Sequence, residues 1–151
     1  MKLKLAVICD EAHERPDGRI DLVGVYDELT APGFPAMQER MTVVFVLDWD
    51  EDETGHQPLR ADLVDQRHVK ILTIEGHTEV AARRTSGRRV AQTRLILPLE
   101  RVVFPQSGRY DFELVAGGDM LQACSIFVTE QSNGESDPAI GATGITPAGS
   151  N

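Results

Sequence analysis

The sequence has few cysteines, few aromatic residues and no long hydrophobic run. Two cysteines in 151 residues cannot form the disulfide framework of a small secreted domain, so reduced thiols and a cytoplasmic location are expected. No apolar run approaches the roughly 20 residues of a membrane-spanning helix. The apolar segment 5–9 is shorter than a signal peptide requires, and acidic residues follow it at once. A membrane partner is therefore not expected.

Positive charge is also scarce. The chain has 15 Lys and Arg residues against 24 Asp and Glu residues, which gives a net charge of -9 at pH 7. An acidic surface repels phosphate, so a nucleic-acid partner is not expected, whereas cationic partners are allowed. Because 41% of the residues are hydrophobic and 26% are charged, the chain can bury a packed core as one domain.

Motifs for catalysis are missing. The sequence contains no Gly-x-Ser-x-Gly elbow, no phosphate-binding loop and no dinucleotide-binding glycine motif. The four histidines do not have zinc-site spacing. Cys9 and Cys124 lie among apolar residues and are expected to be buried core thiols. We therefore expect no enzyme and no cofactor.

Hydrophobic residues recur mainly with a period of two, which indicates β-strands. The segment 79–84 is the one place where a short helical turn is expected. The pattern predicts an all-β protein, an antiparallel β-sandwich of about eight strands with turn signals between them. The expected strands are 2–10, 19–30, 41–49, 59–65, 69–75, 89–97, 108–116 and 120–129.

The composition changes after Glu130. Residues 131–151 contain four Gly, two Pro and three Ser and no aromatic residue. This composition is typical of segments that cannot bury a core. The sequence therefore predicts a β-sandwich domain over residues 1–130 and a disordered tail over residues 131–151.

Two groups of motifs lie near the ends of the predicted domain. They are Cys9-Asp10-Glu11-Ala12, Asp17-Gly18, Leu22-Val23-Gly24 and Phe34-Pro35-Ala36, and then Phe104-Pro105-Gln106-Ser107-Gly108-Arg109-Tyr110-Asp111-Phe112. Together they resemble a family of small uncharacterised bacterial proteins that carries a domain-of-unknown-function label. The resemblance implies a β-sandwich and implies no activity. The residues also have a structural explanation, because the Tyr110 ring can face the core while its hydroxyl bonds a loop backbone.

An acidic run between two predicted strands suggests calcium, which prefers six to eight oxygen ligands. Asp48, Asp50 and Asp52 are the candidate ligands. The run does not match an EF-hand loop, because Glu53 stands where that loop needs glycine and Leu59 where it needs Glu. The alternative interpretation is a solvated acidic loop.

A basic segment stands out against the acidic body of the protein. Arg83, Arg84, Arg88 and Arg89 lie within seven residues. Guanidinium groups suit carboxylates, phosphates or an acidic protein surface, so these four residues are the candidate partner-binding residues. Three alternatives remain: a charged hairpin tip that protects a sheet edge, pairing with the acids of residues 48–53 within the chain or between subunits, or binding of a nucleic acid or a phosphorylated ligand.

These observations predict a non-enzymatic β-sandwich that binds another protein or a second copy of itself. The alternative is a sandwich that binds calcium or a glycan through loops at one end. Trp49 is the only aromatic candidate for sugar stacking, but it shares the parity of Met41, Val43, Phe45 and Leu47 and is expected in the core.

Overall fold

The computed structural model describes residues 1–82 and 90–132, which form nine strands and, within those ranges, no helix. No described segment is a helix long and apolar enough to cross a membrane. The strands are β1 (Lys2–Glu14), β2 (Ile20–Val25), β3 (Glu28–Ala31), β4 (Ala36–Asp48), β5 (Gly55–Val64), β6 (Lys70–Val80), β7 (Gln92–Phe104), β8 (Gly108–Ala116) and β9 (Asp119–Glu130).

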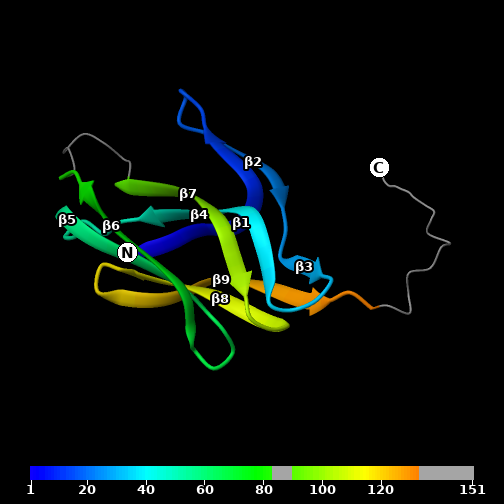
Figure 1. The fold of residues 1–151 in the computed structure, drawn as a ribbon. Helices are drawn as coiled ribbons and strands as arrows, with labels where there is room; N and C mark the ends of the chain where they lie inside the picture. The colour runs from blue at the N-terminus through cyan, green and yellow to red at the C-terminus, as the bar shows by residue number, and fades with distance from the viewer. Residues whose placement is uncertain (83–89, 133–151) are drawn as a thin grey trace.

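The strands form two sheets (Figure 1). The first has four strands in the order β2-β1-β4-β7, and the second has five in the order β3-β9-β8-β5-β6. The all-β prediction is confirmed. The prediction of an antiparallel arrangement is wrong at one place, because β3 pairs parallel to β9. The tail predicted over 131–151 lies outside the described residues from 133 onward.

The segment 19–30 was expected to be one strand and is instead two. β2 pairs with β1, whereas β3 pairs with β9 of the other sheet. The chain crosses between the sheets at Tyr26 and Asp27; the Tyr26 backbone N–H still donates to the carbonyl of Ile8 at 3.0 Å. After this crossing, β3 lies along the edge of β9 and runs parallel to it.

β7 is longer than the predicted strand 89–97. It continues through Pro98, which pairs in register with Thr42 of β4. β7 is an edge strand, and an edge tolerates proline because the missing N–H can fall on the unpaired side. The helical turn expected over 79–84 is wrong at its start, because Glu79 and Val80 belong to β6; residues 83 and 84 lie outside the described ranges.

One hydrophobic core is shared by the two sheets. β4 contributes alternate residues from Met41 to Leu47, and β8 contributes Tyr110, Phe112 and Leu114. Trp49 is only 1% exposed, so its expected place in the core is confirmed. A smaller cluster around Cys9, Val44 and Val46 lies apart from this core.

The expected backbone tie of Tyr110 is confirmed. Its hydroxyl donates to the carbonyl of Gln106 at 2.5 Å and accepts from the Gln106 N–H at 3.2 Å. The ring packs edge-on against Phe104 with centroids 4.9 Å apart. One side chain thus joins the β7–β8 turn to the core.

Candidate functional site

The strands β6 and β7 follow each other in the chain, and each is the last strand of its sheet. Among the described strands, neither has a neighbour on its outer edge. The two strands lie side by side near residues 78 and 93 and then diverge (Figure 1). We call the gap between them the β6–β7 seam. An unpaired edge presents backbone N–H and C=O groups to which another strand can bond.

Three polar side chains close one end of the seam. The Thr78 and Thr93 hydroxyl oxygens are 3.4 Å apart across it. The Trp49 indole N–H donates to Thr93 Oγ1 at 2.8 Å. Because Trp49 is buried, this bond satisfies a donor that would otherwise be costly to bury.

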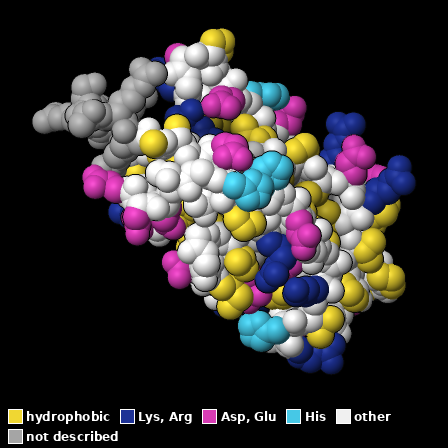
Figure 2. Space-filling view, turned by 90° about the vertical axis from the view of Figure 1, so that its left-hand side faces the viewer, with side chains coloured by type: hydrophobic (Ala, Val, Ile, Leu, Met, Phe, Trp, Pro, Cys, Tyr) yellow, Lys and Arg dark blue, Asp and Glu magenta, His cyan; other side chains and the backbone are white. Residues whose placement is uncertain are grey.

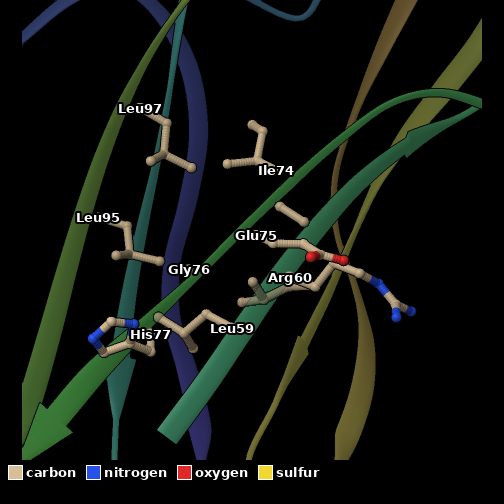
Figure 3. A pocket seen from close by; sticks show the side chains of 10 residues that line it. Leu59, Arg60, Ile74, Glu75, Gly76, His77, Leu95 and Leu97 are labelled. Atoms are coloured by element: carbon tan, nitrogen blue, oxygen red, sulfur yellow. The ribbon is translucent and has the colours of Figure 1, made fainter.

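Beyond the two threonines the seam contains an apolar cavity, which we call the Gly76 slot. Its volume is about 110 Å³. Leu95 and Leu97 of β7 face Ile74 and Leu59 across it (Figure 3). The full lining is Leu59, Arg60, Ala61, Ile74, Glu75, Gly76, His77, Leu95, Leu97 and Leu114.

The slot exists because β6 has no side chain at position 76. Gly76 pairs with Leu59, whose buried side chain shows that this position faces the core. A Cβ built on Gly76 would meet nothing within 4 Å, and its φ is not in the positive range. Neither backbone conformation nor crowding requires glycine here. Glycine in a strand weakens it and often marks a close approach by a ligand or another backbone.

The rim of the slot carries charged and imidazole groups. Glu75, Gly76 and His77 are exposed. The rings of His56 and His77 stack with centroids 4.6 Å apart, and His56 Nδ1 lies 3.4 Å from a Glu79 carboxylate oxygen. Apolar, charged and histidine side chains are intermingled on the face shown in Figure 2, instead of forming a patch of one sign.

Arg60 beside the slot is already held by another group. Its Nε donates to the Asp62 carboxylate at 3.0 Å, and Thr73 Oγ1 donates to the same carboxylate at 2.7 Å. Burial raises the pKa of Asp62, but Thr73, Arg60 and Lys70 together outweigh it, so the pKa is lowered from its usual value. The role of Arg60 in this network is therefore structural: its guanidinium group pairs with the Asp62 carboxylate.

A second, larger hollow of about 430 Å³ lies between β1 and β9. Tyr26 lines it, and its hydroxyl is the one buried side-chain polar atom of the described residues without a hydrogen-bond partner. Burial raises the pKa of Tyr26 to about 12. The nearby Ser125 hydroxyl already donates to Asp111. The hollow therefore presents few polar groups that are free to converge on a ligand.

The structure does not bring the predicted calcium ligands together. Asp48 accepts a bond from Gln92 at 2.8 Å, and Asp50 lies 2.5 Å from the Met1 amine. Within residues 1–82 and 90–132, no group of three or more His, Cys, Asp or Glu residues could hold a metal ion. Asp52 is an exposed turn residue. The predicted partner-binding residues Arg83, Arg84, Arg88 and Arg89 lie outside the described residues.

Sequence reasoning missed the Gly76 slot. The predicted strand 69–75 ended one residue before Gly76, because glycine commonly ends a strand pattern. The available signal was the apolar alternation at Leu72 and Ile74, which continues to Val80 if Gly76 is read as an inward position.

The comparison with protein families matches residues 4–129, which span β1 to β9. The chain belongs to DUF6941, a family of unknown function. This confirms the resemblance to an uncharacterised domain family. No curated protein matches the chain. The DUF6941 match includes β6, β7 and the slot between them.

Proposed function

We propose that this DUF6941 domain is a β-sandwich that acts as a non-enzymatic protein-interaction module through the β6–β7 seam. The observation that supports this proposal most directly is the Gly76 slot, an apolar cavity that opens between two edge strands. Partner strands commonly bind by adding to an exposed sheet edge, where backbone bonds give affinity and side-chain pockets give specificity. The seam offers both features at one place.

The chemistry of the slot supports binding more than catalysis. Leu59, Ile74, Leu95, Leu97 and Leu114 make its walls aliphatic. Catalysis needs several polar groups that converge on one reacting atom. An aliphatic wall instead removes an apolar side chain from water, which stabilises a complex in proportion to the area buried.

The basic segment belongs to this proposal as well. Arg83, Arg84, Arg88 and Arg89 lie between the end of β6 at Val80 and the start of β7 at Gln92. Their positions in the sequence thus fall in the connection between the two strands of the seam. Guanidinium groups suit acidic residues elsewhere on the partner, away from the strand that adds to β6, so reversal of all four charges to Glu is expected to weaken binding of the intact partner.

Site-specific photo-crosslinking tests the proposal. A photoreactive amino acid replaces exposed His77 at the seam or, as a control, exposed Glu39 on β4. In a lysate of the source organism, we expect one adduct of defined mass from position 77 and none from position 39. Excess unlabelled protein should suppress it. An adduct of twice the chain mass would identify self-assembly. Equal labelling from both positions, or no adduct, would refute a partner at the seam.

A further inference from the structure

We infer that the Gly76 slot receives one branched aliphatic side chain from an extended partner segment, with a Lys or Arg next to that side chain. The segment adds as a strand to the free edge of β6. This inference rests on the proposed function and specifies the chemistry of the partner.

The size of the slot selects the side chain. An apolar protein cavity of roughly 150 Å³ holds a benzene molecule, and the Gly76 slot has about 110 Å³. A Leu, Ile or Val side chain suits this volume, whereas a Trp ring exceeds it. Because the walls are aliphatic, a polar side chain would lose its hydrogen bonds to water without replacement.

The pleat of β6 limits recognition to one inward position. Alternate residues of a strand point to opposite faces, so Ile74, Gly76 and Thr78 share the inward face of β6. Ile74 has a side chain of its own that lines the slot, and Thr78 closes the seam with Thr93. Only the position of Gly76 is left open for a side chain supplied by the partner.

Charge on the other face of β6 selects the neighbour. A residue next to the inserted side chain points outward, beside Glu75 or His77. Glu75 is exposed; Arg60 lies opposite it on β5 but pairs with Asp62, and Glu75 forms no ion pair with any other residue in the described ranges. An opposite charge at this cross-strand position is favourable and a like charge is not. The partner therefore carries Lys or Arg directly before or after the aliphatic residue.

The chain's own C-terminal segment fits this description poorly. Residues 133–151 contain Ile140 and Ile145 but also two acids, Glu135 and Asp137, and no Lys or Arg. Ala139 and Gly141 flank Ile140, and Gly144 and Thr146 flank Ile145, so neither isoleucine has a basic residue next to it. The charge pattern thus favours a separate, basic partner segment over this tail.

Selection from a phage-displayed library of random 12-residue peptides tests the inference on the full chain. We expect enriched peptides to share an aliphatic residue flanked by Lys or Arg. Gly76→Leu, which fills the slot, should weaken their binding at least tenfold, and Gly76→Ala should weaken it less. Gly33→Leu is the matched control, because Gly33 also has open space at its Cβ and no positive φ. If Gly76→Leu does not fold, Gly76→Ala carries the test.

Charge reversal tests whether the partner carries a Lys or Arg next to the inserted side chain. Glu75→Lys should weaken the selected peptides several-fold and reduce the salt dependence of binding, whereas Glu39→Lys on β4 should leave both unchanged. Enriched peptides that ignore Gly76→Leu, or that carry acidic flanks, would overturn the inference. A selection that enriches no peptide would also overturn it. The same holds if sedimentation shows that the chain forms a dimer and that Gly76→Leu dissociates this dimer. If crosslinking at position 77 still succeeds, such results refute the partner chemistry and leave the proposed function standing.

Discussion

Thr78 of β6 and Thr93 of β7 bring their hydroxyl oxygens within 3.4 Å of each other across the two sheets. Two residues before Thr78, Gly76 leaves an open slot, and two residues after Thr93, Leu95 forms part of its wall. The same two strands are therefore closed at one point and open at the next inward position. Trp49, which donates to Thr93, links this closure to the core.

Thr93→Val should destabilise the protein. It removes the acceptor of the Trp49 indole N–H and leaves a buried donor without its partner, at a cost of about 1–3 kcal/mol in the free energy of unfolding. Thr78→Val should cost less, because Thr78 makes only the longer 3.4 Å contact with Thr93. Urea unfolding followed by the fluorescence of Trp49, the single tryptophan, measures both variants. A larger loss for Thr78→Val would refute this account of the closure.

The chain's two tyrosines form a matched pair of tests. Tyr110→Phe removes both bonds to Gln106 and should lower the free energy of unfolding by about 1–3 kcal/mol. Tyr26→Phe removes a buried hydroxyl that has no partner among the described residues, so it should leave stability unchanged or raise it by up to about 1 kcal/mol. Chemical denaturation of the two variants compares them. Equal losses would contradict the assignment of the backbone tie to Tyr110.

Acid should destabilise the protein through Asp65, which holds the β5–β6 turn. Its carboxylate accepts the backbone N–H groups of Val69 and Arg67 at 2.9 and 2.8 Å. These bonds, that of Val69 foremost, hold the pKa of Asp65 below its usual value. A lowered folded-state pKa contributes stability that is present above the unfolded value of about 3.9 and is lost as pH falls through the folded value.

The acid prediction is checked with Asp65→Asn. The variant should be less stable than the wild type at pH 7, and the difference should shrink as the pH falls below about 4. Urea midpoints measured between pH 7 and pH 2.5 give the comparison. A difference that stays constant or grows over this range would show that the charge of Asp65 does not stabilise the turn.

Cys124 should react slowly in the folded protein. Burial raises its pKa to about 12, so its thiolate fraction at pH 8 is roughly three orders of magnitude below that of a free cysteine with a pKa of about 8.5. Alkylation followed by peptide mass spectrometry separates Cys124 from Cys9. Labelling of Cys124 at the rate of a free thiol before unfolding would contradict this prediction; rapid labelling after unfolding is the expected control.

Local patterns predicted much of the fold. The strand expected over 108–116 matches β8 at both ends, because alternation and the flanking glycines are local signals. The core position of Trp49 and the turn before Tyr110 could be predicted for the same reason. The division of 19–30 into β2 and β3 was not, since both halves alternate and only their different partners separate them.

The sequence by itself determined that this protein is all-β, because the period of its hydrophobic residues is visible along the chain. It also determined the acidic balance and the residues that face the core of most strands. Only the tertiary structure decided which strands became edges, and therefore that β6 and β7 meet around an open position at Gly76. The physical reason is that strand pairing is non-local: a glycine leaves a cavity only when the sheets place aliphatic walls around it.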